Sequence, residues 1–176
     1  MDKKEMRKSI EGLCSEIVKN NPDMKSLCII GIRKRGDILA ERIANVLKKT
    51  TKWEISVGVM DITLYRDDLT KYGPKPIIGS TYFPCSIEGK EVLLVDDVLY
   101  TGRTIRSALD EIVDYGRPLR VQLAVMINRG GRELPISPDY VGVSVELKDK
   151  EEVQVLLEET DEEDSIKIVE VSNGAR

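Results

Sequence analysis

Two adjacent carboxylates, Asp96 and Asp97, stand in the part of the sequence best suited to chemistry. They follow the apolar run 92–95, which predicts a buried strand, and they precede a turn of small and hydroxyl residues at 101–104. Such a turn presents backbone N–H groups at the start of a helix, where a phosphate is favoured. Carboxylates at that edge of a sheet bind ribose hydroxyls or a hydrated Mg²⁺. A plainer alternative is that the pair only caps the following helix, because other strand-to-helix turns carry similar acidic pairs.

The chain contains no histidine, and this absence limits the chemistry. It excludes Ser-His-Asp and Cys-His catalysis and every zinc site that uses histidine. A general base or metal ligand must therefore be Asp, Glu, Lys, Tyr or Cys. The three cysteines, Cys14, Cys28 and Cys85, show no CxxC spacing, which is typical of reduced thiols in a cytoplasmic protein.

Length and composition predict one domain over residues 1–176, with 41% hydrophobic and 33% charged residues. The longest uncharged stretch, 76–87, is too short to cross a membrane, and the first residues lack the apolar core of a signal peptide. The net charge is −7 over residues 146–176 and +3 over residues 1–145. A mildly basic body accepts phosphate ligands, but it is not typical of a general nucleic-acid binder.

Hydrophobic periodicity predicts an α/β fold, with a mostly parallel central sheet flanked by helices. A small β-rich hood and a C-terminal hairpin complete this expectation, and the acidic segment 158–164 is expected to be the hairpin turn. The polar stretch 63–89 is too long for a simple connection, so we expect a functional flap there. The first predicted helix has its apolar face over 6–17 and ends at 20–22, and the other predicted helices cover 38–47 and 104–115. The predicted strands cover 27–31, 54–62, 92–95, 121–127, 153–157 and 166–171.

The full segment 92–104, VLLVDDVLYTGRT, resembles the signature with which type I phosphoribosyltransferases bind phosphoribosyl pyrophosphate (PRPP). Further segments narrow the resemblance to the PyrR family, whose members are pyrimidine operon regulators and uracil phosphoribosyltransferases. The resemblance runs over about residues 5–169. The segments that carry it are MDITLYRDDL at 60–69, DDVLYTGRTIRSALDEIVDYGRP at 96–118, VQLAV at 121–125 and RGGRELPI at 129–136.

The resemblance implies a role for each matching residue. Asp96, Asp97 and Arg66 are the expected catalytic residues, and Mg²⁺ is expected to bind with PRPP beside the two aspartates. Arg66, Asp67 and Asp68 open the flap that is expected to close over PRPP and exclude water. Pyrophosphate is expected to contact Lys34, Arg35 and Gly36. The ribose and 5′-phosphate of PRPP are expected to contact Asp96, Asp97, Val98, Leu99, Tyr100, Thr101, Gly102, Arg103 and Thr104.

The implied reaction transfers phosphoribose from PRPP to uracil and gives UMP and pyrophosphate. Tyr100 stands where purine-specific relatives often carry a carboxylate, which favours a pyrimidine. The expected base-binding residues are Asn128 and Arg129. Asn128 replaces the family's usual aspartate and Gly131 its usual histidine, so a phosphoribosyltransferase for another base is an alternative.

The same resemblance implies binding to pyrimidine operon (pyr) mRNA, for which the sequence retains one expected contact, Arg132. The other expected RNA positions have lost their usual side chains, which weakens contact with phosphates. We therefore expect weak RNA binding, and a nucleotide-sensing transcriptional attenuator with little catalysis is the alternative function. Family members are homodimers or higher oligomers, which we expect here also. The altered RNA positions are Glu11, Gly12, Ser15, Ser137 and Val143.

Overall fold

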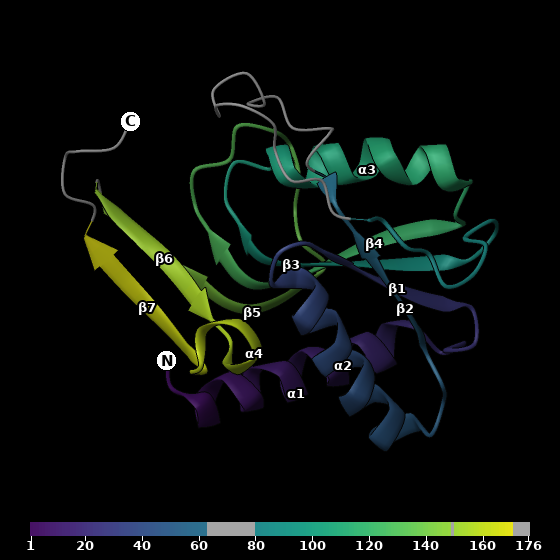
Figure 1. The fold of residues 1–176 in the computed structure, drawn as a ribbon, viewed down its shortest axis with the longest axis horizontal. Helices are drawn as coiled ribbons and strands as arrows, with labels where there is room; N and C mark the ends of the chain where they lie inside the picture. The colour runs from purple at the N-terminus through teal and green to yellow at the C-terminus, as the bar shows by residue number, and fades with distance from the viewer. Residues whose placement is uncertain (63–79, 149, 171–176) are drawn as a thin grey trace.

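The computed structural model describes residues 1–62, 80–148 and 150–170, and helices alternate with strands through its first half (Figure 1). The predicted helices and strands all have an observed counterpart within a few residues of their predicted bounds, but the strand at 140–145 was not among the predicted ones. The elements are α1 (Lys3–Asn20), β1 (Leu27–Ile32), α2 (Gly36–Thr51), β2 (Ser56–Met60), β3 (Glu91–Leu99), α3 (Arg103–Tyr115), β4 (Arg120–Arg129), β5 (Tyr140–Val145), β6 (Glu151–Leu156), α4 (Glu158–Asp161) and β7 (Ser165–Glu170).

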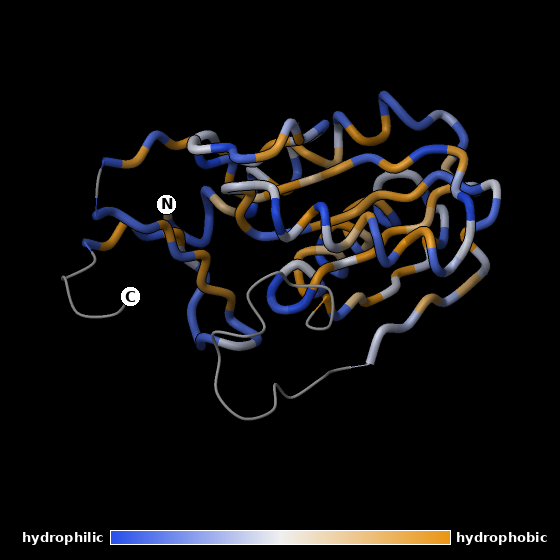
Figure 2. The backbone as a smooth tube through the Cα atoms, turned by 90° about the horizontal axis from the view of Figure 1, so that it is seen from above, coloured by the Kyte–Doolittle hydropathy of each residue, from blue (hydrophilic) through white to orange (hydrophobic). Residues whose placement is uncertain are grey.

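The central sheet has the order β2-β1-β3-β4-β5, and all of its neighbouring strands are parallel. Helices α1 and α2 cover one face, and α3 covers the other (Figure 1). Alternate residues of one strand therefore enter different cores. Ile29 and Leu93 pack on the side of α1 and α2, whereas Ile30 and Leu94 pack on the side of α3. Burial on both faces explains the continuous apolar runs, which Figure 2 shows along the central strands.

Helix α1 begins with a capping box that its sequence encodes. The Asp2 carboxylate accepts a hydrogen bond from the Glu5 N–H (2.8 Å), and the Glu5 carboxylate accepts one from the Asp2 N–H (2.9 Å). The helix buries the face predicted from the spacing of its apolar residues. Those buried residues are Met6, Ile10, Leu13, Cys14 and Ile17.

The C-terminal hairpin is confirmed, because β6 and β7 pair in antiparallel fashion as a separate two-stranded sheet. The segment predicted as a simple turn contains the short helix α4, so that part of the prediction was wrong. We call residues 151–170 the hood. The Met1 ammonium donates to the Ile166 carbonyl oxygen (2.9 Å), and the Ile166 N–H donates to the Met1 carbonyl oxygen (3.0 Å). The start of the chain therefore lies against the hood (Figure 1).

The end of the predicted flap packs onto the body of the protein. Tyr82 exchanges two backbone hydrogen bonds with Val59 of β2 (2.7 and 2.9 Å), and the ring of Phe83 stacks on that of Tyr115 with centroids 4.2 Å apart. The first part of that flap, with Arg66, Asp67 and Asp68, lies outside the described residues. Among the helices that are described, none combines the length and apolar character needed to cross a membrane.

Candidate functional site

The Asp96–Asp97 pair lies inside β3 and not after its end, which corrects the predicted strand boundary. Strand β1 pairs with β3 only as far as Val95, whereas β4 continues to pair as far as Leu99, opposite Asn128. The two aspartates therefore have a strand on one side only. On the other side, β1 has already turned into the loop 33–35, which precedes α2. This uneven end of the sheet places the aspartates and the basic loop together.

The environment of the pair disfavours negative charge. Asp96 is 5% exposed, and its Oδ1 accepts the Asp97 N–H (2.9 Å), while Asp97 Oδ1 accepts the Val98 N–H (2.8 Å). Burial, followed by the neighbouring charge of Asp97, raises the pKa of Asp96 well above its ordinary value. Burial also raises the pKa of Asp97, against the lowering effect of the Val98 N–H and of the Arg35 charge. A ligand that brings hydroxyl donors or positive charge would relieve this energetic cost.

The loop 33–35 is held close to β3 by two glycines. A Cβ atom on Gly36 would lie 2.5 Å from the Val95 carbonyl oxygen, and one on Gly31 would lie 2.4 Å from the Asp37 Cα. Neither position has room for a side chain, so the backbone can approach the end of β3 directly. Lys34 is exposed, and Arg35 is half-buried with a φ of 74° at the start of α2. Two of the three predicted pyrophosphate contacts, Arg35 and Gly36, thus lie beside the aspartates.

The turn after β3 has the conformation that its glycine predicts. Gly102 has a φ of 95° at the N-cap of α3, and a Cβ there would be 3.4 Å from Leu134 and Ile136. The Thr101 carbonyl oxygen accepts hydrogen bonds from the N–H groups of Glu133 (3.0 Å) and Leu134 (3.1 Å). The turn therefore rests on the segment after β4. The first turn of α3 has no acidic residue, which keeps its N-terminus suited to an anion.

Tyr100 and the end of β4 form a second wall of the site. The Arg129 guanidinium lies over the Tyr100 ring, 3.9 Å from its centroid, which is a cation–π contact. Gly131 has a φ of 94°, and a Cβ atom there would lie 2.6 Å from Tyr100 Cε2. A histidine at this position would therefore require Tyr100 to move. The glycine leaves this position of the Tyr100 ring undisturbed.

Arg132, expected as an RNA contact, is used inside the protein. Its Nε donates to the Ile136 carbonyl oxygen (3.1 Å), and its Nη1 donates to the carbonyl oxygens of Leu99 (3.1 Å), Arg129 (2.8 Å) and Tyr100. Its Nη2 donates to Asn128 Oδ1. These bonds occupy the Asn128 oxygen, so the Asn128 amide offers N–H donors to a ligand. Arg132 thus braces the wall of the site, and its contact with RNA stays a prediction.

The altered RNA positions are placed as follows. Glu11, Gly12 and Ser15 are exposed on α1, and Glu11 Oε1 accepts a hydrogen bond from Arg7 Nε (3.0 Å). Ser137 is exposed, and Val143 is half-buried in β5, the strand that packs on α1. Three of these five positions therefore share one helix, where Arg7 already has the Glu11 carboxylate as a partner.

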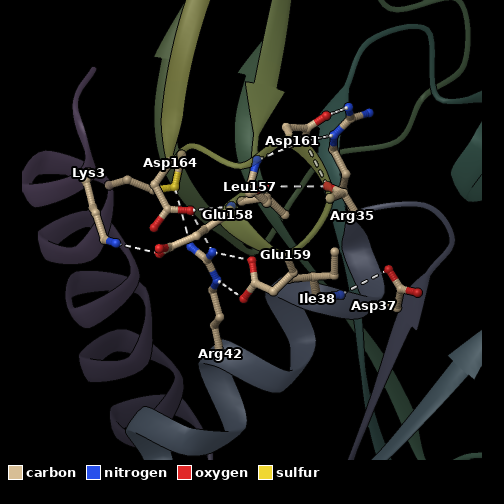
Figure 3. A network of polar contacts seen from close by, with 12 residues as sticks. Lys3, Arg35, Asp37, Ile38, Arg42, Leu157, Glu158, Glu159, Asp161 and Asp164 are labelled. Atoms are coloured by element: carbon tan, nitrogen blue, oxygen red, sulfur yellow. Dashed lines mark hydrogen bonds and ion pairs between the residues drawn. The ribbon is translucent and has the colours of Figure 1, made fainter.

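One residue of this region was missed by sequence reasoning. Asp161 of α4 accepts two hydrogen bonds from Arg35, to Oδ2 from Nε (3.2 Å) and to Oδ1 from Nη2 (2.8 Å), as Figure 3 shows. The two residues are 126 positions apart, and the acidic composition around Asp161 is typical of a solvated turn. Only the folded chain brings them together.

The donor set is compatible with a magnesium ion that arrives with its substrate. In the described part of the chain, no group of three His, Cys, Asp or Glu side chains is arranged to hold a metal. Asp96 and Asp97 supply carboxylates from one strand. Mg²⁺ is usually held by one or two carboxylates together with substrate phosphates and water. Two aspartates beside a helix start that suits an anion agree with that pattern.

Comparisons with known proteins place this arrangement among phosphoribosyltransferases. A family model described as the phosphoribosyl transferase domain matches residues 2–160. The chain is 49% identical over 172 residues to the bifunctional protein PyrR of Pelotomaculum thermopropionicum, which covers 98% of this chain and 95% of that protein. It is 48% identical over 170 residues to the bifunctional protein PyrR of Thermus aquaticus, covering 97% and 94%.

Solved structures show the same fold at lower identity. A hypoxanthine phosphoribosyltransferase of Trypanosoma cruzi superposes with a TM-score of 0.73 at 19% identity, over 98% of this chain and 95% of that one. A purine phosphoribosyltransferase from Pyrococcus horikoshii gives a TM-score of 0.62 at 24% identity, over 84% and 85%. The type I phosphoribosyltransferase fold expected from the sequence is thereby confirmed.

Proposed function

The chain belongs to the PyrR family of phosphoribosyltransferases, and from this premise we propose that it makes UMP and pyrophosphate from uracil and PRPP. The observation that carries the proposal is the Asp96–Asp97 pair, buried between the basic loop 33–35 and the phosphate-binding turn. Each part of PRPP then meets matching chemistry: a helix start for the 5′-phosphate, carboxylates for the ribose hydroxyls, and cations for pyrophosphate.

In the proposed reaction, a ring nitrogen of uracil attacks C1 of the ribose as the bond to pyrophosphate breaks, and the proton of that nitrogen passes to water or to the released pyrophosphate. The bond electrons leave with pyrophosphate, and positive charge develops on the sugar. Asp96 and Asp97 would hold the ribose hydroxyls and lie near that charge. Lys34 and Arg35 would bind the departing pyrophosphate. Mg²⁺ held by PRPP and the two aspartates would offset charge on the leaving group.

Recognition of uracil is assigned to the end of β4. Because Asn128 Oδ1 is occupied by Arg132, the Asn128 amide can donate to a carbonyl oxygen of the base. The Tyr100 ring, held by Arg129, offers no carboxylate that could accept a purine proton. These two features favour a pyrimidine over a purine.

The test is UMP formation from uracil, PRPP and Mg²⁺, with hypoxanthine, guanine and orotate in parallel reactions. We expect turnover with uracil and with none of the other three bases. The Asp97→Asn variant should lose about 100-fold or more of this activity, since an electrostatic contact in the transition state is removed. Asp110→Asn, on the exposed side of α3, is the matched control and should keep full activity. Turnover with another base alone would assign a different substrate, and no turnover with any base would contradict an enzymatic role.

A second proposed activity, regulation of pyrimidine genes through mRNA attenuation, is supported by the similarity to bifunctional PyrR proteins. Two features lower the expected affinity: the carboxylate of Glu11 on α1, and the use of Arg132 in bracing the active site. In a gel-shift assay, we expect weak binding to a pyr attenuator hairpin with or without UMP. Adding an arginine at one of the altered RNA positions, by Gly12→Arg, should strengthen binding, whereas tight UMP-stimulated binding by the unaltered chain would contradict the expectation.

A further inference from the structure

The contact between Arg35 and the hood has the geometry of a specific recognition. Nε and Nη2 of the guanidinium donate to the two oxygens of the Asp161 carboxylate, at 3.2 and 2.8 Å, which makes the ion pair bidentate (Figure 3). Paired bonds of this kind fix the orientation of the guanidinium as well as its position. The Arg35 hydrogen bond also lowers the pKa of Asp161, which therefore stays ionised at neutral pH.

The Asp161 carboxylate is itself held in place from two directions. Oδ2 accepts the Leu157 N–H (2.9 Å) and the Thr160 hydroxyl (2.8 Å) from its own helical turn. The whole turn is then tied to α2, because Arg42 donates to Glu159 Oε1 (2.9 Å). An acceptor that is fixed before Arg35 reaches it can determine where the guanidinium lies.

The bonds to Asp161 leave part of the guanidinium available. Among the described residues, Nη1 of Arg35 makes no hydrogen bond, and the charge of Asp97 acts on Arg35 from the side of the active site. Arg35 therefore stands between the hood and the aspartate pair, with one edge bound. The remaining N–H groups suit a phosphate oxygen.

We propose that Asp161 is a positioning residue that orients Arg35 for pyrophosphate, an inference that rests on the proposed function. A free arginine side chain occupies many rotamers, and it must lose that conformational entropy when it binds a ligand. The hood makes Arg35 lose that entropy beforehand. The Asp161 carboxylate offsets part of the positive charge of Arg35, so it contributes to pyrophosphate binding by orienting the guanidinium and not by adding charge. In this way the hood is linked to the pyrophosphate loop.

The experiment compares two amide substitutions in the same helix. Asp161→Asn removes one edge of the Arg35 contact, and Glu159→Gln removes a similar bond to Arg42 without touching Arg35. We expect Asp161→Asn to lower kcat/KM for PRPP about tenfold and to weaken binding of inorganic pyrophosphate, because a misplaced cation costs transition-state binding. The KM for uracil and the activity of Glu159→Gln should stay at the values of the unaltered chain.

A double-mutant cycle separates positioning from general stability. Lysine cannot form the paired contact, so Arg35→Lys combined with Asp161→Asn should lose no more kcat/KM than Arg35→Lys alone. The inference would be overturned if the losses in kcat/KM of the two substitutions were additive. It would also be overturned if Asp161→Asn and Glu159→Gln lost equal activity in step with a lower Tm, or if Asp161→Asn bound pyrophosphate as tightly as the unaltered chain or more tightly. If the unaltered chain makes no UMP, the proposed function fails, and calorimetric titration with inorganic pyrophosphate still decides the role of Asp161.

Discussion

The aspartate pair of β3 and the acidic residues of the hood are the same kind of side chain under opposite conditions. Asp96 and Asp97 are enclosed by the sheet, and burial raises the pKa of both. In the hood, a hydrogen bond from Arg42 lowers the pKa of Glu159. Burial acts most strongly on Asp164, but its bonds with Arg42 and a backbone N–H outweigh it and lower the pKa. The difference lies in the cations: both of these hood carboxylates bond to Arg42, whereas the pair depends on backbone N–H groups.

This contrast separates a binding site from a structural contact. Ionised carboxylates that are already paired have little left to offer a ligand, and they contribute to keeping the hood on α2. Carboxylates that are buried without a full positive partner lower the stability of the fold. A protein retains such carboxylates where function needs them. Arg35 lies between the two groups, because it binds Asp161 and acts on the charge of Asp97.

Removing Arg42, the α2 residue that binds the acidic residues of the hood, should have the largest effect on stability. Arg42 donates to Asp164 Oδ1 (2.6 Å) and to Glu159, and its side chain is 20% exposed. Arg42→Ala should lower the free energy of unfolding by about 2 kcal/mol, less than for a fully buried pair, because solvent still screens the contact. Urea unfolding measures this change.

Lys3→Met is the matched control for that prediction. Lys3 also forms an ion pair with the hood, through Glu158, but both side chains are largely exposed. Its removal should leave Tm unchanged, because exposed ion pairs contribute little. Equal effects of the two substitutions would show that burial does not distinguish the contacts.

A smaller effect of opposite sign is expected at the aspartate pair. Asp96→Asn should stabilise the protein by about 1 kcal/mol at pH 8, because a neutral amide replaces a carboxylate that burial disfavours. Asn also keeps an oxygen that can accept the Asp97 N–H. The same variant should lose activity, since the proposed contact with the ribose hydroxyls needs the carboxylate.

The stabilisation expected from Asp96→Asn depends on pH in a direction that follows from the raised pKa of Asp96. A folded pKa above the unfolded value means that Asp96 stabilises the fold only in its protonated form, and that this contribution is lost as pH rises toward the folded pKa. The Tm difference between Asp96→Asn and the unaltered chain should therefore vanish near pH 4 and grow above it. Asp164→Asn, whose folded pKa is lowered, should instead lower Tm above pH 4. A lower Tm for Asp96→Asn at pH 8 would contradict the comparison.

Much of the site was predictable because its signals are local. Apolar runs bounded by turns predicted every strand except β5, and the spacing of apolar residues predicted the buried face of α1. Gly102 marked the turn where a positive φ is needed, and the segment 92–104 marked the turn at which we propose that phosphate binds. The exact end of β3 was not predictable, because whether a strand continues past its aspartates depends on pairing with β4.

The sequence by itself therefore determined the fold class, the family and the residues that face the end of β3, since periodicity and motif belong to neighbouring positions. The tertiary structure decided the uses of Arg132, Gly131 and Asp161. Arg132 is a surface cation by composition, yet it braces carbonyl groups, and Gly131 leaves room for the neighbouring ring of Tyr100. Asp161 becomes a partner of Arg35 only when residues 126 positions apart meet, and no local pattern encodes such a contact.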